Sequence, residues 1–423
     1  MLNIKKQLTV YSSHLVILCL LLTFNCLFSN DVNAQALTLD SILKKVEQNN
    51  PLLESYKSSI EAYTEKAKGA KSLDAPTLQT GLDNISYDFK SSSPTFRISG
   101  QQMFTNPKKL GARKSYLESL SAIETNDAGF TKNQLHAEAK RLYYERLVNE
   151  KSLKVLKENS KLMEIMLNLA TVKYTYAESN LGTIYKIKAS LSELKIKKLR
   201  MQNMIQMSTT GLNYLMGVKN NSPFVIDTVL NLKMYQNYVN DALNLSLLEN
   251  RSDVQKMSNT INSMRLNQTL TLTQSKPDFG IMYEHMGRFG KPDLFYVSGK
   301  MTIPIAPWSA KGYKHSVKSI DFEIKAMQKE RENMINMASR MVNENLYHIR
   351  IENQILDDYQ TKVIPDLKKG FDVALTAYEQ NTGQLLAVID VWESLNMMQM
   401  EYLEHLRETL LLVVDYEREI EKK

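Results

Sequence analysis

Two acidic residues near the end of the chain lie where paired carboxylates could act together. Asp390 and Glu393 are three residues apart in the segment AYEQNTGQLLAVIDVWESL (377–395), which places both carboxylates on one face of a helix. They follow a break at Gly383 in an otherwise continuous helical pattern. Carboxylates gathered at close range attract cations. The alternative is a solvated helix face, because 23% of the residues in this chain are charged.

No other combination of residues indicates catalysis. The sequence contains no Ser/His/Asp arrangement and no phosphate-binding loop. The chain has 21 methionines, and since Met commonly fills irregular helix packing we predict packing rather than copper ligands. The sequence therefore predicts no enzyme, no cofactor and no metal centre. The histidines after residue 34 show no ligand spacing; they are His136, His285, His315, His348 and His405.

The first 34 residues are expected to be a secretory signal peptide. Two lysines precede the apolar run HLVILCLLLTFNCLF, and VNA at 32–34 fits a cleavage site. Both cysteines, Cys19 and Cys26, lie in this segment. Neither follows the small residue that lipoprotein processing needs, which argues against a lipid anchor. We therefore expect an exported protein without disulfides.

Charge and hydropathy argue against a nucleic-acid-binding protein and against a protein with membrane-spanning helices. The net charge of +7 is spread along the chain instead of forming a basic patch with interleaved aromatic residues, so nucleic-acid binding is not expected. After the signal peptide, no stretch has the roughly 18 uninterrupted apolar residues of a membrane-spanning helix.

The rest of the chain is predicted to be a duplicated unit. Several residues at element boundaries recur in order at an offset of 201 positions, which is typical of an internal repeat. We place the first repeat at 35–235 and the second at 236–423. The matching pairs include Asp40 with Asp241, Pro76 with Pro277, Gly111 with Gly312, and Gly182 with Gly383.

Each repeat carries the same order of elements. Apolar periodicity predicts very long helices of some 65 residues, which would span roughly 100 Å. In the first of them, a heptad seam runs from Leu135 to Ala170. Pro365 should kink the second. The predicted elements are a helix (38–70 and 238–273), two strands (77–89 with 95–105, and 278–288 with 294–305), the long helix (112–179 and 314–380) and a returning helix (184–216 and 384–420).

The strands alternate in the manner of transmembrane β-strands. In the last run, Phe295, Val297 and Met301 share one face, whereas Ser298 and Lys300 share the other, over about ten residues. Aromatic residues in the strand regions are candidates for an interfacial girdle, with core packing in a soluble sheet as the alternative. They are Tyr87, Phe89, Phe104, Tyr283, Phe295 and Tyr296.

The whole pattern resembles the TolC-like outer-membrane efflux ducts. The resemblance rests on the duplicated unit, the NNPLL opening at 49–53, the strand pairs, MTIPIAPW at 301–308 and VIPDLKKGFDVALTAYEQNTGQLLAVIDVWESL at 363–395. It implies a mainly α fold with a small β part. It also implies a homotrimer in the outer membrane of a Gram-negative bacterium. Each chain would contribute four strands to one lipid-contacting β-barrel and its helices to a long periplasmic barrel.

The resemblance implies a passive exit duct that works with an inner-membrane pump and a periplasmic adaptor. Its cargo would be small molecules or metal ions. A type I protein-secretion duct of the same fold and a structural periplasmic coiled-coil protein are the alternative functions. The amphipathic strands argue against the coiled-coil protein, which has no use for them.

The resemblance also assigns expected roles at one end of the molecule. Gly182 and Gly383 would form hairpin tips, each with a left-handed residue, that an adaptor contacts. Asp390 and Glu393 would ring the periplasmic tip. Lys186 and Lys188 occupy the matching stretch of the first repeat, GTIYKIKASL, and could pair with these acids as a gate. The alternative is that both are ordinary surface lysines.

Overall fold

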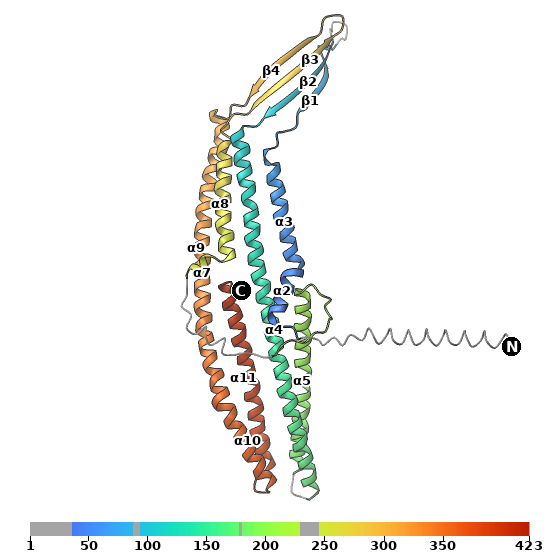
Figure 1. Cartoon of the computed structure of the whole chain (residues 1–423), viewed down its shortest axis with the longest axis vertical. Helices are drawn as coiled ribbons and strands as arrows, with labels where there is room; N and C mark the ends of the chain where they lie inside the picture. Colours follow the sequence, from blue (N-terminus) through green and yellow to red (C-terminus); the bar gives the residue numbers. More distant parts are fainter. Residues whose placement is uncertain (1–35, 88–93, 177–179, 229–244, 423) are drawn as a thin grey trace, which may run out of the picture.

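The computed structural model describes residues 36–87, 94–176, 180–228 and 245–422. The molecule is elongated, with a four-stranded sheet at one end and two helical hairpin tips at the other (Figure 1). The expected signal peptide and the expected boundary between the two repeats lie outside these residues. Among the described residues, no helix is both long enough and apolar enough to span a membrane.

The mainly α fold with a small sheet is confirmed, and the same order of elements occurs in both halves of the chain. The first half contains α2 (Leu39–Asn49), α3 (Pro51–Lys68), a short 3-10 turn (Gly69–Lys71), β1 (Thr77–Asp83), β2 (Thr95–Phe104), α4 (Pro107–Thr175) and α5 (Leu181–Leu215). The second contains α7 (Leu245–Glu249), α8 (Ser252–Thr273), β3 (Phe279–Arg288), β4 (Leu294–Met301), α9 (Pro307–Asp358), the π-helical turn η3 (Tyr359–Val363), α10 (Ile364–Glu379) and α11 (Leu385–Glu419).

Asparagine and proline set several helix boundaries that periodicity misplaced. The helix expected at 38–70 is two helices, because extended Asn50 ends α2 and accepts a hydrogen bond from Leu52 N (3.0 Å) as the cap of α3. Pro51 follows as the first residue of α3. The long helices begin at Pro107 and Pro307 rather than near 112 and 314, because proline suits the first position of a helix; Asn106 also caps α4 with its side chain, whereas Ala306 before α9 has no side-chain cap.

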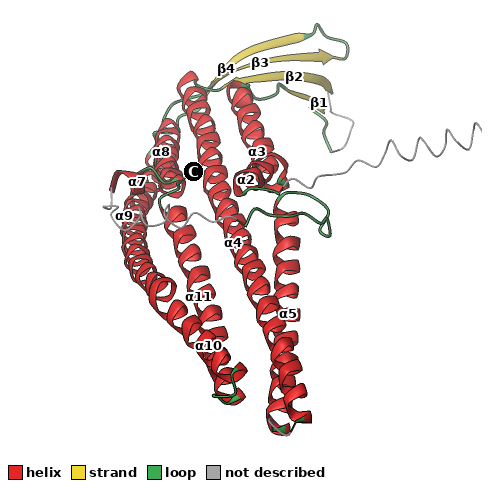
Figure 2. Ribbon diagram, turned by 60° about the horizontal axis from the view of Figure 1, so that its bottom comes forward, coloured by secondary structure: helices red, strands yellow, loops and turns green. Residues whose placement is uncertain are grey.

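The kink expected from Pro365 takes the form of a π-helical turn. Proline has no N–H and its ring clashes with the carbonyl four residues earlier. The backbone accordingly widens to the π form over Tyr359–Val363, immediately before α10. In both views, α9 and α10 together run the length that α4 covers alone (Figures 1 and 2).

The strands form one antiparallel sheet in the order β1-β2-β3-β4. The first strand stops at Asp83 rather than at 89, because Asn84 has a left-handed φ of 55°. The last stops at Met301 rather than at 305, since Pro304 has no N–H to offer a ladder. Where β3 and β4 meet the helices, Thr302 N donates to Asp278 O (3.0 Å) and Thr302 Oγ1 accepts from Asp278 N (2.8 Å).

The heptad seam of α4 is buried or half-buried along its whole length. Ala139, Leu156, Met163 and Ala170 are fully buried. The seam packs α4 against α2, α5, α10 and α11 in two apolar cores. The part of α4 before the seam contacts α3 and α8, with hydrogen bonds from Tyr56 to Asp127 and from Asn259 to Ala122 O, so α4 has packing partners from the sheet to the tip.

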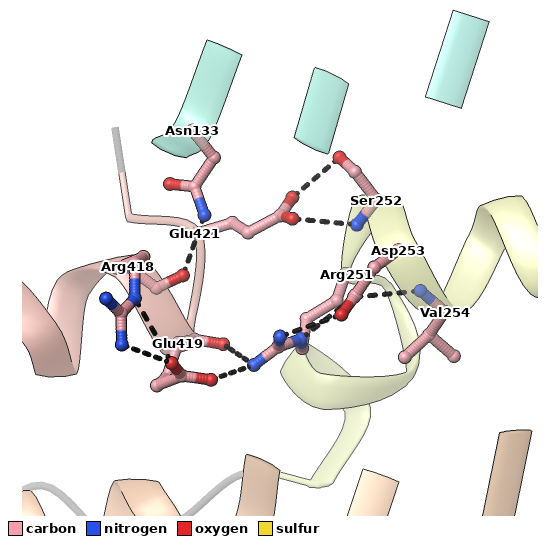
Figure 3. Close-up of polar contacts among 8 residues, drawn as sticks. All are labelled: Asn133, Arg251, Ser252, Asp253, Val254, Arg418, Glu419 and Glu421. Carbon is pink, nitrogen blue, oxygen red and sulfur yellow. Dashed lines mark hydrogen bonds and ion pairs between the residues drawn. The ribbon is translucent and has the colours of Figure 1, made fainter. Parts of the chain in front are cut away.

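Halfway along the molecule, a polar network ties the end of α11 to the start of α8 (Figure 3). Arg251 bonds the Glu419 carboxylate and also donates to Glu419 O (2.9 Å). Arg251 forms a second ion pair with Asp253 (2.9 Å). Burial alone would lower the pKa of the Arg251 guanidinium, but the hydrogen bonds to Asp253 and Glu419 outweigh burial and raise that pKa.

Glu421, which follows α11, and Asn133 of α4 complete this polar network. Glu421 accepts from both the backbone N and the hydroxyl of Ser252 (2.9 and 2.8 Å). Asn133 Nδ2 of α4 donates to Arg418 O (2.8 Å). Three helices that are distant in sequence are therefore joined at mid-length.

Removing one partner of the buried Arg251–Glu419 pair should destabilise the protein strongly. Glu419→Leu leaves a buried guanidinium with less compensation and should cost about 3 kcal/mol of unfolding free energy. The double variant Arg251→Met/Glu419→Leu removes both charges and should recover much of that loss. Thermal unfolding of the purified protein in detergent would measure both.

Glu65→Leu is the matched control, because the Lys68–Glu65 pair is exposed and contributes about 0–1 kcal/mol. An equal loss for Glu419→Leu and Glu65→Leu would contradict an anchoring role for the buried pair.

Candidate functional site at the hairpin tips

The second hairpin turns between α10 and α11, and the structure corrects the residue responsible. Asn381, with a φ of 58°, is the left-handed residue of this turn. Gly383 was expected to have that conformation, but among the described glycines only Gly217 and Gly290 have positive φ. The backbone N–H groups of Thr382 and Gly383 both donate to Ala377 O (2.9 and 3.0 Å), which closes the end of α10.

Gly383 is required for space rather than for its φ. A Cβ at this position would lie 3.0 Å from Ala377 Cβ and 3.3 Å from two backbone atoms. Gly182 is different, since it lies in the first turn of α5, where Asn180 Oδ1 accepts from Gly182 N (2.8 Å). A Cβ there would meet Asn180 only at 3.4 Å, an ordinary contact.

Lys186 of α5 joins the two hairpins through the acids of α11. Its Nζ lies 2.8 Å from Asp390 Oδ1 and 3.4 Å from Glu393 Oε2. The hydrogen bond to Asp390, with support from Glu393, raises the pKa of the Lys186 amine. The side chains of Lys186, Asp390 and Glu393 are 35%, 59% and 44% exposed, so water and salt screen this contact.

The other candidate lysine lies elsewhere. Lys188 Nζ is 5.6 Å from the ring centroid of Tyr185, and no ion pair links it to a described acid. Lys173, at the end of α4, makes a second link between the hairpins that sequence reasoning missed. Lys173 Nζ donates to Tyr378 O (2.9 Å) and to Asn381 Oδ1, and it lies 4.2 Å from the Tyr378 ring centroid.

Beside these polar links, and extending away from the tips, a shared apolar core holds the hairpins together. Trp392 of α11 is buried in it, and its indole N–H donates to Asn159 Oδ1 of α4 (3.0 Å). Asn159 in turn donates to Gln399 of α11 (3.0 Å). The core is formed by residues of α4, α5, α10 and α11: Leu156, Met163, Met166, Ala170, Ile184, Ile187, Leu194, Phe371, Tyr378, Leu385, Val388, Ile389, Trp392 and Leu395.

At the opposite end of the molecule, the strand register separates an apolar face of the sheet from a polar face. Residues paired across the sheet share a face. The pairs Phe104–Phe279, Gly100–Tyr283 and Tyr283–Val297 therefore lie on one side. We call this side the apolar face; its large members are exposed, and they are Leu78, Leu82, Phe96, Ile98, Phe104, Phe279, Ile281, Tyr283, Phe295, Val297 and Met301.

The other side carries charged groups. Arg97 forms an ion pair with Asp83 (2.9 Å) and approaches Glu284 at 3.9 Å. Tyr296 pairs with Glu284 and so belongs to this polar face.

The aromatic residues expected in a girdle are distributed unevenly. Phe104, Tyr283 and Phe295 lie on the apolar face, at different positions along the strands. Tyr296 does not lie on that face, since the period of two in a strand points neighbouring residues to opposite sides. Tyr87 is fully exposed beyond the end of β1, and Phe89 lies outside the described residues.

Comparisons with solved structures decide the fold. A structure of the outer-membrane channel OprN has a TM-score of 0.74 at 10% identity, covering 90% of this chain and 89% of that one. A CusC structure, from work on transmembrane channel formation, has a TM-score of 0.75 at 11% identity, covering 90% and 91%. The outer membrane protein VceC from Vibrio cholerae has a TM-score of 0.71 at 13% identity, covering 90% and 95%. The chain has the TolC-like fold.

This likeness lies in the shape of the chain and not in its sequence. No protein-family model and no curated protein matches it. The identities of 10 to 13% leave the TolC-like fold as the shared property. The roles of individual tip residues therefore depend on their own geometry.

The two tip glycines should respond differently to alanine. Gly383→Ala forces a Cβ against Ala377 and should destabilise the turn by about 1–3 kcal/mol. Gly182→Ala is the matched control, since alanine favours the first turn of α5 and should be neutral or stabilising by about 0.4–1 kcal/mol. Hydrogen exchange of the backbone amides at 376–388 would report the local change. Unaltered exchange in Gly383→Ala would refute the steric requirement.

Proposed function

We propose that this protein is the outer-membrane exit duct of a tripartite efflux system, passively conducting small molecules or metal ions outward. The observation that carries the proposal is an exposed apolar sheet face at one end of a helical body with the TolC-like fold. Solved structures with this fold include an outer-membrane channel. The fold is that of a channel family, which argues against an enzyme.

The sheet supports an assembly of several copies. β1 and β4 are its edge strands, and four strands are too few to close around a pore. Strands β2 and β3, of ten residues each, have the length that a tilted membrane strand requires. In a homotrimer, the sheets of three chains would complete one barrel. The apolar face would then meet lipid, and Arg97 and Glu284 would line the interior.

The aromatic residues of the apolar face suit this arrangement. Phe104 and Phe279 lie at the end next to the helices, which would be the periplasmic interface, and Phe295 lies toward the other end. Tyr87 lies beyond the end of β1. Aromatic residues concentrate at such interfaces. The long helices would then extend into the periplasm.

The hairpin tips are the proposed gate and the proposed contact with a periplasmic adaptor, which an inner-membrane pump would accompany. Three copies of Asp390 and Glu393 near the axis would attract cations. Lys186 neutralises part of this charge and ties α5 to α11, while Lys173 ties α4 to the second tip. Exposed pairs contribute only about 0–1 kcal/mol each, so a docked adaptor could overcome them.

Single-channel conductance in planar bilayers tests the gate. The double variant Lys173→Ala/Lys186→Ala removes both links and should raise the open probability several-fold. Lys188→Ala, which removes a lysine of α5 that contacts no described acid, should leave the conductance unchanged. Asp390→Ala should weaken block by multivalent cations. An unchanged open probability in the double variant, together with unchanged cation block in Asp390→Ala, would contradict the assignment of the tips as a gate.

Membrane fractionation with unheated gel electrophoresis tests the duct itself. The expected product is an outer-membrane oligomer of about three times the chain's mass that dissociates only on heating. A purely soluble monomer would overturn the proposed function.

A further inference from the structure

Three residues that can bind a metal ion meet between α9 and α11. Glu352 comes from α9, and His405 and Glu408 come from α11. One ligand atom from each lies within 4.8 Å of the other two. His405 Nδ1 is already 2.8 Å from Glu352 Oε2. His405 and Glu408 are three residues apart, which places them on one face of α11. We call this group the Glu352 cluster.

The surroundings hold the imidazole in place. The side chains of His405 and Glu352 are 26% and 13% exposed, so both are partly withdrawn from water. The Tyr359 ring lies against the imidazole, with 5.6 Å between ring centroids. Arg407, the neighbouring cation, donates its hydrogen bonds to Glu404 (3.0 and 3.1 Å). The imidazole and the Glu352 carboxylate already face each other, and the Glu408 carboxylate lies beside them.

We propose that Glu352, His405 and Glu408 bind a divalent first-row transition cation of the Zn²⁺ type. One imidazole nitrogen and two carboxylate oxygens are a ligand set that Zn²⁺ accepts, with the remaining position taken by water. Mg²⁺ prefers oxygen ligands in near-ideal octahedral geometry, so it fits less well. Ligand atoms in a tetrahedral zinc site are about 3–3.5 Å apart. Small side-chain rotations would bring the cluster to that spacing.

Binding would clamp two helices at a defined place. Glu352 lies seven residues before the π-helical turn at Tyr359–Val363, where α9 gives way to α10. From His405, α11 continues to Asp390 at the tip over about 22 Å, at 1.5 Å per residue. The cation would therefore hold α9 against α11 in the part of the hairpin that lies farther from the tip than Asp390 and Glu393. This inference goes beyond the proposed duct and does not depend on it.

Calorimetric titration of the chelator-treated full chain in detergent with Zn²⁺ tests the proposal. We expect one saturable Zn²⁺ per chain in the wild type and no comparable Mg²⁺ binding. His405→Gln and Glu408→Gln should each weaken Zn²⁺ binding at least tenfold. His315→Gln is the matched control, because His315 is exposed on α9 and far along the helix from Glu352.

A melting measurement separates metal binding from a merely structural ion pair. Glu408 is exposed, so without metal the Glu408→Gln variant should have the same melting temperature as the wild type. The variant should, however, lose the rise in melting temperature that Zn²⁺ causes in the wild type. If His405→Gln fails to fold, Glu408→Gln carries the test alone. The absence of saturable Zn²⁺ binding in the wild type, or wild-type affinity in either folded variant, would overturn the proposal.

Discussion

The buried seam of α4 is the constraint on which the rest of the molecule depends. The 69 residues from Pro107 to Thr175 form one helix that joins the sheet to the tip, and α2, α3, α5, α8 and α11 pack against it. Its seam mixes apolar residues with Arg146, Asn149 and Ser160, and these polar members are also buried. Arg146 illustrates how this is tolerated, since it pairs with Glu150 (2.9 Å) and donates to Phe224 O (2.7 Å). Because α4 is one continuous helix with packing partners along its length, it fixes the distance between the sheet at one end and the hairpin tip at the other.

Sequence patterns predicted the features that depend on local periodicity. The alternation in 294–305 and the heptad spacing from Leu135 each follow from where one backbone geometry points its side chains. These patterns predicted the two strand pairs and the long helices, whereas the expectation of hairpin tips at one end came from the family resemblance. Boundaries were less accurate, because a single residue decides them. Asn50 divides one expected helix and Asn84 shortens one expected strand.

Contacts between distant segments could not be predicted in the same way. Arg251 and Glu419 are 168 residues apart, and Glu352 and His405 are 53 apart. Each is a common residue type with no local signal. Lys173 was overlooked for a similar reason, since it meets Tyr378 and Asn381 only once both hairpins are packed. Tyr296 shows a different limit: its type suggested a girdle, but strand register places it beside Glu284 on the polar face.

The apolar face of the sheet also imposes an order on folding. Helices form from contacts close in sequence, which are made rapidly, and the cores around α4 can bury their side chains within one chain. The sheet cannot do so, because no layer of the described part of the chain covers Leu78, Ile281 and Val297, and β1 and β4 are its edge strands. An apolar sheet with open edges is a site of aggregation in water. The strands must therefore complete their pairing last, at a surface that receives their apolar side chains, after the helical body has formed.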